Sequence, residues 1–278
     1  MKAPKTCSPL LLIVAALCAT SCMLGCGRTS LETSFIVKGT PDRIFGGTPV
    51  SEGDPLRKKI VGIRIQKNQG DDTSTCTGAI IAPNLILTAA HCVLAAQESS
   101  TQIDVIFGTT DLYQITNENI HAVEKITIHP QYLALREELQ ANKLWKIVNV
   151  FDLALLMLKK PLIGAEPFTF LAENLPFTSV TVAGFGFQSY DLLTGQRAGL
   201  PRLNRIELQL LTSLQRSTLL VDQSHDHGVC LGDSGAPAFI MHGDIAILMG
   251  IVASVRNPGS AEICRGIGNL IKIPEKFF

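Results

Sequence analysis

The sequence has no excess of charge of either sign, because 24 Lys and Arg residues balance 24 Asp and Glu residues among its 278 positions. No bulk electrostatic attraction therefore favours nucleic acid, an anionic membrane or a strongly charged substrate. The cysteine and histidine spacings of common metal sites, CxxC and HxxxH, are also absent. We accordingly expect no nucleic-acid partner, no metal and no other cofactor.

The N-terminal apolar run is too short to cross a membrane as a helix. It extends from Leu10 to Ala19, roughly half of the about 20 residues that such a helix needs. Lys2 and Lys5 precede the run and small residues follow it, which is the layout of a secretory signal. We predict that residues 1–26 are a signal peptide removed on export, with a membrane anchor as the alternative.

Two cysteines in this leader suggest a lipid attachment. Cys22 and Cys26 each follow a small residue just after the apolar run, a layout that resembles the bacterial lipoprotein signal and favours a bacterial exported protein. Both matches lack the usual aliphatic residue three positions before the cysteine, so plain secretion is the alternative. We expect a secreted or cell-envelope protein that contacts a membrane only through such a lipid.

The body of the chain contains four further cysteines, Cys76, Cys92, Cys230 and Cys264. An exported chain forms disulfides readily, and four cysteines allow three connectivities. Disulfides are favoured over metal ligation because no metal-type spacing occurs.

The body is predicted to be all-β. Residues 27–43 are polar in patches and contain Gly39 and Pro41, which suits a cleavable propeptide. Beyond them, short stretches rich in Ile, Val, Leu and Thr are separated by Gly, Pro, Asn and Asp, a pattern typical of a sandwich or barrel. These stretches are 59–66, 79–90, 103–108, 152–158, 179–187 and 246–255. Residues 132–148 are locally helical and predicted to form an inserted surface loop, and 273–278 a short terminal helix.

Three motifs place reactive side chains in a fixed order. LTAAHC contains His91, FDLALLML contains Asp152 and GDSGAP contains Ser234. Taken singly, each residue has a structural interpretation, as a buried histidine, a strand cap and a tight turn. Together, and with the junction Arg43-Ile44-Phe45-Gly46-Gly47, they resemble the trypsin-like serine proteases of the chymotrypsin fold, from about residue 44 to the C-terminus.

This resemblance implies two packed six-stranded Greek-key β-barrels, formed by residues 44–278, with the active site in the cleft between them. It also implies a catalytic triad. Ser234 is the nucleophile, His91 the base that takes its proton, and Asp152 the carboxylate that orients the imidazole. The backbone N–H groups of Gly232 and Ser234 are expected to stabilise the oxyanion, and Gly232 allows the backbone conformation that this requires.

The resemblance further implies a zymogen. Cleavage after Arg43 by an activating protease would free the amine of Ile44, which would pair with Asp233 beside the nucleophile. The two implied disulfides are Cys76–Cys92 and Cys230–Cys264.

The implied specificity pocket departs from that of trypsin itself. Gly228, six residues before Ser234, stands where an aspartate selects basic side chains, and Val255 and Gly268 are assigned to the pocket walls. Because a Lys or Arg side chain would be desolvated without a partner, we expect small or medium aliphatic residues before the cleaved bond of a protein or peptide substrate.

Two other functions stay open at this point. The first is a binding module, that is, a family member that has lost catalysis, although such proteins usually lack a triad residue. The second is an esterase of another fold, although in such enzymes the GDS serine lies near the N-terminus. We also expect a monomer.

Overall fold

The computed structural model describes the ranges 44, 46–67, 73–97, 101–141, 150–170, 176–187, 189–190, 197–198, 201–211, 217–225, 227–256 and 264–274. By its internal contacts the chain divides into Met1–Lys38 and Gly39–Phe278, and all that follows concerns the second unit. The predicted signal peptide 1–26 and propeptide 27–43 lie outside the described residues.

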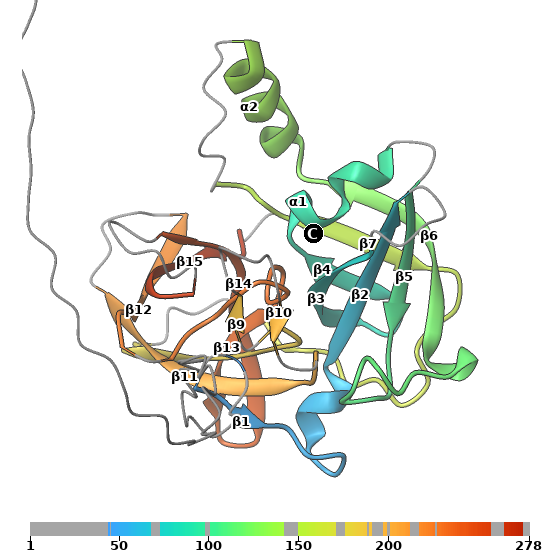
Figure 1. Ribbon diagram of the computed structural model, residues 1–278, viewed down its shortest axis with the longest axis horizontal. Coiled ribbons are helices and arrows are strands. Elements are labelled where there is room, and N and C mark those ends of the chain that lie inside the picture. The colour runs from blue at the N-terminus through green and yellow to red at the C-terminus, as the bar shows by residue number, and fades with distance from the viewer. Residues whose placement is uncertain are drawn as a thin grey trace, which may run out of the picture. The chain divides into compact units, whose positions relative to one another are not determined.

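Six antiparallel strands close the first barrel (Figure 1), in the order β2-β3-β4-β7-β6-β5. Because every strand has a partner on each side, closure removes the exposed edges that an open sheet would have. The strands are β2 (Ile60–Lys67), β3 (Thr73–Ala82), β4 (Leu85–Thr88), β5 (Thr101–Ile106), β6 (Ile120–Ile128) and β7 (Ala154–Leu158).

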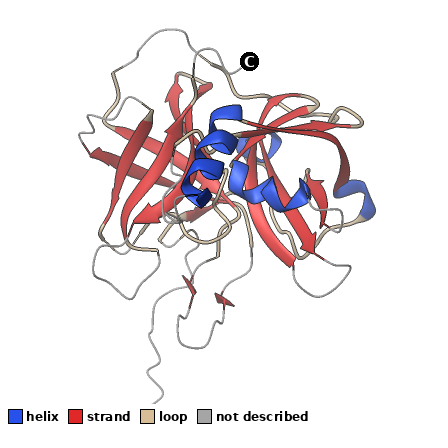
Figure 2. Cartoon of the chain, turned by 90° about the horizontal axis from the view of Figure 1, so that it is seen from above, coloured by secondary structure: helices blue, strands red, loops and turns tan. Residues whose placement is uncertain are grey.

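The second barrel follows later in the chain. Strand β8 pairs with both β13 and β11, which closes the order β11-β12-β15-β14-β13-β8, and β1 adds to β11 outside the ring. The predicted fold of two six-stranded barrels is therefore confirmed, and Figure 2 shows how strands dominate. The strands are β1 (Thr48–Pro49), β8 (Ser179–Gly184), β11 (Asn204–Leu211), β12 (Thr218–Gln223), β13 (Pro237–His242), β14 (Ile245–Arg256) and β15 (Gly266–Lys272), with a separate pair β9 (Ser189–Tyr190) and β10 (Arg197–Ala198).

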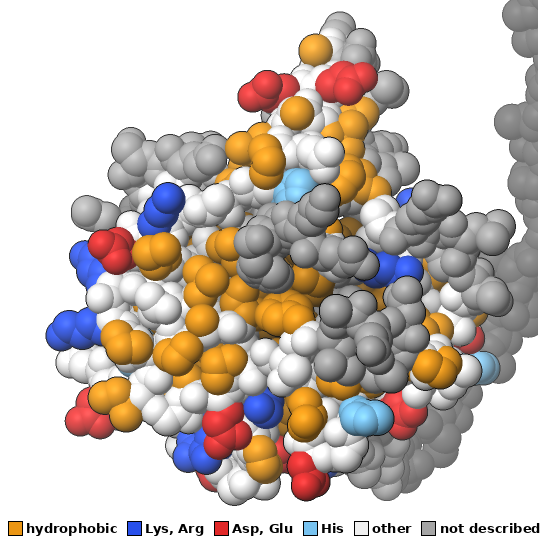
Figure 3. Space-filling model, turned by 180° about the vertical axis from the view of Figure 1, so that it is seen from behind, with side chains coloured by type: hydrophobic (Ala, Val, Ile, Leu, Met, Phe, Trp, Pro, Cys, Tyr) orange, Lys and Arg blue, Asp and Glu red, His pale blue; other side chains and the backbone are white. Residues whose placement is uncertain are grey.

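Alternating side chains explain why these stretches form barrel strands. In β11, Ile206 and Leu208 are buried, whereas Arg205, Glu207 and Gln209 between them are exposed. A period of two places apolar residues on the inner face and polar residues in solvent. On the face in Figure 3, basic and acidic side chains both occur around the rim, in keeping with the zero net charge.

Helices are short and few in the described ranges, and none is long and apolar enough to span a bilayer. The helix predicted over 132–148 is present as α2 (Pro130–Ala141), with 142–149 outside the described residues. At the C-terminal end, Ile273 and Pro274 are not helical, and 275–278 lie outside the description. The others are α1 (Ala90–Val93), η1 (Pro55–Lys58), η2 (Leu94–Gln97) and η3 (Asn117–Asn119).

A buried threonine of β3, Thr77, is one of the residues that join the two barrels. The Thr77 backbone N–H donates to Ser234 O at 2.9 Å, and its hydroxyl donates to Gly232 O at 2.9 Å. The same hydroxyl accepts from Phe185 N at 3.0 Å, and Thr77 O accepts from the Thr88 hydroxyl at 2.8 Å. The Ser234 turn of the second barrel is thus hydrogen-bonded to a strand of the first.

We predict that Thr77→Val lowers the free energy of unfolding by about 1–3 kcal/mol, because Gly232 O and Phe185 N lose a buried partner while the side-chain volume is kept. Urea denaturation measures the change. Thr127→Val on the exposed face of β6 is the matched control and should change the stability little. Equal effects of the two substitutions would contradict the role of the Thr77 hydroxyl.

Candidate active site

His91 and Asp152 meet through two hydrogen bonds, although 61 residues separate them along the chain. His91 lies in the one-turn helix α1, directly after strand β4. Its backbone N–H donates to Asp152 Oδ1 at 2.9 Å, and its ring Nδ1 lies 2.6 Å from Asp152 Oδ2. The Asp152 carboxylate is 3% exposed and the His91 imidazole 38% exposed. The buried carboxylate therefore fixes the ring, while part of the ring stays accessible to solvent.

A strained residue stands directly before Asp152. Phe151 has a φ of 58°, which costs a residue with a side chain about 1–3 kcal/mol. The strain is held by Leu153, whose N–H donates to Phe151 O at 2.7 Å, and by His129, whose ring stacks on Phe151 at 5.1 Å. The backbone around Asp152 is therefore fixed by its neighbours before β7 begins.

The charges around this pair favour a protonated imidazole. Burial would lower the pKa of His91, but the hydrogen bond and the negative charge of Asp152 outweigh it, so the pKa of His91 lies above its ordinary value. Burial and the charge of Asp152 also raise the pKa of Tyr132 to about 12, against the lowering effect of Arg136. Tyr132 therefore stays neutral at any working pH.

Ser234 lies in a sharp turn between two glycines with positive φ. Gly232 has a φ of 95° and Gly235 a φ of 80°. A Cβ at Gly235 would lie 2.2 Å from Thr88 Oγ1, so only glycine fits. The N–H groups of Asp233, Gly235 and Ala236 donate to backbone carbonyls. Those of Gly232 and Ser234 have no acceptor among the described residues, which leaves two adjacent donors for a ligand.

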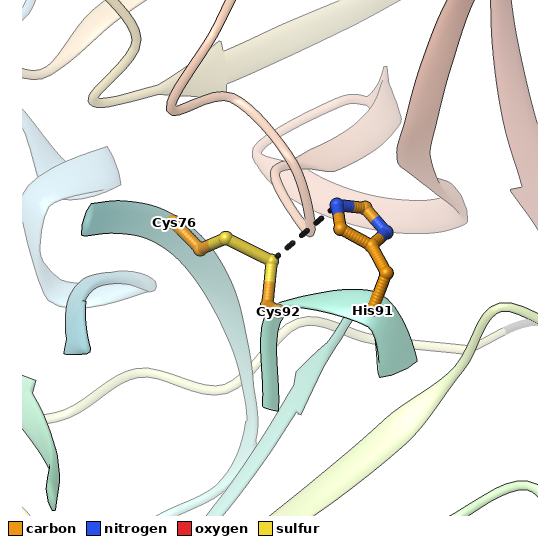
Figure 4. A group of neighbouring side chains, drawn as sticks. All are labelled: Cys76, His91 and Cys92. Carbon is orange, nitrogen blue, oxygen red and sulfur yellow. Dashed lines mark hydrogen bonds between the residues drawn. A yellow bond between two sulfur atoms is a disulfide. The ribbon is translucent and has the colours of Figure 1, made fainter. Parts of the chain in front are cut away.

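Ser234 and His91 line one cavity of about 230 Å³, together with Gly232, Leu231, Phe187 and the two sulfur-linked cysteines 76 and 92. Within the described ranges no hydrogen bond joins the Ser234 hydroxyl to the imidazole, and His91 Nε2 lies 3.8 Å from Cys92 Sγ (Figure 4). Catalytic hydrogen bonds of this kind are often long before substrate binds. The three side chains thus lie at one site. The hydrogen bond between Asp152 and His91 is formed, and the one between His91 and Ser234 is not.

Comparison with known proteins assigns this arrangement to a family. Residues 44–273 match the family model described as Trypsin. This chain belongs to the trypsin family of serine proteases. The match begins at Ile44, the residue after the predicted cleavage site, and includes His91, Asp152 and Ser234.

Three relatives show how far the likeness extends. The chain is 26% identical to "Venom serine protease 34" of Apis mellifera over 212 residues (71% of this chain, 48% of the relative). It is 28% identical to "Venom serine protease" of Polistes dominula over 193 residues (64% and 65%), and 27% identical to "Coagulation factor XI" of Bos taurus over 281 residues (87% and 43%). The chain spans about half the length of these curated relatives. All three are animal proteins, so they lend no support to the predicted bacterial origin.

Two disulfides flank the trypsin-family site. Cys76 is bonded to Cys92 and Cys230 to Cys264, with Cα–Cα distances of 6.3 and 4.8 Å, and these are the pairs that the family resemblance implies. The sulfurs of the first pair and a ring nitrogen of His91 lie within 4.8 Å of one another. Because these sulfurs are bonded to each other, they are not thiolates and do not form a metal site.

Asp233, beside Ser234, is a fully buried carboxyl group. Its oxygens accept from Gly186 N at 2.8 Å and Cys230 N at 2.9 Å. Burial raises its pKa to about 7, although these two backbone hydrogen bonds lower it. Ile44 is also completely buried, in the apolar cluster of the second barrel, and its φ of 40° is unusual for a β-branched residue. Arg43 lies outside the described residues.

The three residues assigned to the specificity pocket come together around a side chain that the sequence analysis did not single out. Gly228 and Gly268 both face the buried Gln223, and Val255 pairs with Gly268 in the β14–β15 ladder. The signal available in the sequence was one amide at the end of a largely apolar stretch, TLLVDQ. Tyr132 was likewise not assigned to the site.

We predict that the free energy of unfolding of the unprocessed chain changes with pH because of Asp233. Because its folded pKa is about 7 against 3.8 ordinarily, folding favours the protonated form. The stabilisation is complete below about pH 4 and is lost as the pH rises through 7, by up to about 4 kcal/mol at 1.36 kcal/mol per pKa unit. Chemical denaturation from pH 4 to 8 should show the loss in the wild type and not in Asp233→Asn. If the difference in free energy of unfolding between the wild type and Asp233→Asn does not change with pH, the prediction is contradicted.

Proposed function

We propose that the chain is an exported serine endopeptidase that hydrolyses peptide bonds of a protein or peptide substrate, with Ser234, His91 and Asp152 as its catalytic triad. The observation that carries the proposal is the two-point hydrogen bonding of His91 by Asp152 beside Ser234 in one cavity. A binding module would not need the imidazole to be held in one orientation at the mouth of a cavity.

In the acylation step, Ser234 Oγ attacks the peptide carbonyl carbon while its proton passes to His91 Nε2. Asp152 Oδ2 accepts the Nδ1–H bond, which fixes the ring tautomer and stabilises the imidazolium that forms. The imidazolium then gives its proton to the departing amine as the C–N bond breaks. Water, deprotonated by His91, hydrolyses the resulting ester and restores the Ser234 hydroxyl.

The oxyanion that forms in each step needs hydrogen-bond donors that are already in position. The N–H groups of Gly232 and Ser234 serve this purpose, since neither is used inside the turn. Such a donor contributes about 3 kcal/mol to the stability of the transition state. Thr77 supports this function by holding Gly232 O and Ser234 O.

Cleavage after Arg43 by an activating protease is proposed to convert the zymogen. The φ of Ile44 is defined by its bond to residue 43, so cleavage there removes the strain of a φ of 40°. The new ammonium group then favours the ionised form of Asp233, a buried carboxyl whose other partners in the described part of the chain are only backbone N–H groups. Release of strain and formation of this pair both favour the processed state.

Substrate preference is proposed to exclude Lys and Arg before the cleaved bond, in favour of small or medium aliphatic residues. Gly228 supplies no carboxylate for a cation. Val252 still bonds to Ala236 O and Gly235 N on the β13 side, but beyond Val252 strand β14 pairs with β15 as far as Arg256 and not with β13. This free side accepts an extended peptide as an additional strand.

Export is proposed from the leader and the disulfides. Two disulfides in the described part of the chain suit an oxidising compartment, so we place the mature protein outside the cell or in the cell envelope. Bacterial origin, removal of residues 1–26, lipid attachment at Cys22 or Cys26 and a monomeric state remain proposals that depend on the sequence alone.

We predict that a peptidyl phosphonate labels Ser234 once the chain has been cleaved after Arg43, and that Ser234→Ala abolishes labelling and lowers turnover about 10⁶-fold, the size known for loss of a triad nucleophile. Mass spectrometry of the labelled peptide and peptide hydrolysis measure the two effects. Ser74→Ala, which lines the same cavity, is the control. A processed, folded chain that is not labelled would support the binding-module alternative.

The pKa of His91 lies above its ordinary value of 6.5. We predict that kcat/KM falls as the pH drops through this pKa, because the protonated ring cannot act as a base. Asp152→Asn removes the groups that raise this pKa, so the acid limb should move to lower pH, and kcat should fall about 10⁴-fold, the loss known for this triad. His121→Gln, outside the cavity, should leave the limb in place. A limb that does not move in Asp152→Asn would show that Asp152 does not control the base.

A further inference from the structure

Gln223 is a completely buried polar side chain at the end of strand β12. Its Nε2 donates to Val229 O at 3.2 Å and to Cys264 O at 3.0 Å, and its Oε1 accepts from Val229 N at 3.3 Å. Both amide hydrogens are therefore used, and the side chain is fixed in one orientation.

These hydrogen bonds place Gln223 behind the turn of the proposed nucleophile. Val229 precedes Cys230, and Cys230 is bonded to Cys264, so the amide is bonded to the backbone on both sides of this disulfide. Cys230 N in turn donates to Asp233, the neighbour of Ser234. A chain of hydrogen bonds thus connects Gln223 to the proposed reaction centre.

The two glycines assigned to the pocket make room for Gln223. A Cβ at Gly228 would lie 2.6 Å from Gln223 Cβ, and one at Gly268 would lie 2.8 Å from Gln223 Oε1. Real Cβ atoms do not approach so closely, so neither position tolerates a side chain while the glutamine is there. The space between Gly228 and Gly268 is occupied by protein.

The cavity beside Ser234 does not include this space. Its lining includes Leu231, Phe187 and the Cys76–Cys92 disulfide, and none of Gly228, Gly268 and Gln223 belongs to it. A long substrate side chain that entered between the two glycines would have to displace an amide with three buried hydrogen bonds.

We infer that Gln223 is a specificity-determining residue: it fills the space between Gly228 and Gly268, leaves no room there for a long side chain, and so restricts the residue before the cleaved bond to Gly, Ala or Ser. The inference rests on the proposed endopeptidase activity and narrows its aliphatic preference to the smallest side chains. Volume is the physical basis, because the engaged amide has no free hydrogen to offer a substrate and no charge.

The test compares processed wild type, Gln223→Ala and Gln223→Met, each titrated with a peptidyl phosphonate so that rates refer to active molecules. Peptides that differ only in Ala, Leu or Phe before the cleaved bond give kcat/KM ratios. We expect Ala to be preferred in the wild type, and the Leu/Ala and Phe/Ala ratios to rise at least about tenfold in Gln223→Ala, as for an enlarged apolar pocket. Gln223→Met keeps most of the volume without the hydrogen bonds, so its ratios should stay near those of the wild type.

A residue that merely braces the fold gives a different result. Both variants would then lower kcat/KM for all three peptides by the same factor, with the ratios unchanged, and the inference would be overturned. If Gln223→Ala does not fold, the wild type alone still tests the inference. Faster cleavage after Leu or Phe than after Ala by the wild type would overturn the inference. Absence of phosphonate labelling in the wild type defeats the proposed function itself, and the inference with it.

Discussion

The hydrogen bonds of Thr77 across the two barrels are the constraint on which the rest of the structure depends. His91 and Asp152 belong to the first barrel, whereas Ser234 lies in a turn of the second. Each barrel closes by its own strand pairing, and that closure does nothing to align one with the other. Thr77, bonded to both Gly232 and Ser234, aligns the Ser234 turn with a strand of the first barrel, alongside other contacts such as the Arg202–Asp111 ion pair, so the site is a property of the contact between the barrels.

Two buried carboxyl groups near this contact have opposite electrostatic surroundings. Asp152 faces an imidazole, a partner that can carry a positive charge. Among the described residues, Asp233 accepts hydrogen bonds only from backbone N–H groups, which carry no charge, and burial raises its pKa although these hydrogen bonds lower it. One carboxylate is therefore supplied with a titratable partner within the chain, while the other lacks a cation in the unprocessed form. This difference separates Asp152, which acts in the proposed chemistry, from Asp233, which is proposed to respond to cleavage after Arg43.

Local patterns predicted the two-barrel fold, and they singled out His91, Asp152 and Ser234 because each lies in a short motif at the end of a strand or in a glycine turn. Helix α2 was predicted from its local composition in the same way. Thr77 and Gln223 escaped prediction for a physical reason. The hydroxyl of Thr77 bonds to a carbonyl 155 residues away, and Gln223 bonds to one 41 residues away. No local spacing encodes either contact. The leader, Arg43 and the lipid site lie outside the described residues.

Under the proposed endopeptidase function, closure of both barrels also bears on how the protein survives among copies of itself. A protease cleft of this type takes its substrate as an extended strand with unsatisfied backbone groups. In the first ring each strand is paired with a neighbour on both sides, and in the second ring the same holds except where β14 extends past β13, so the paired segments are withheld from a neighbouring cleft. The proposed activity would then direct self-digestion to loops and to segments outside the rings, where cleavage concentrates in folded proteins, and would spare the barrels.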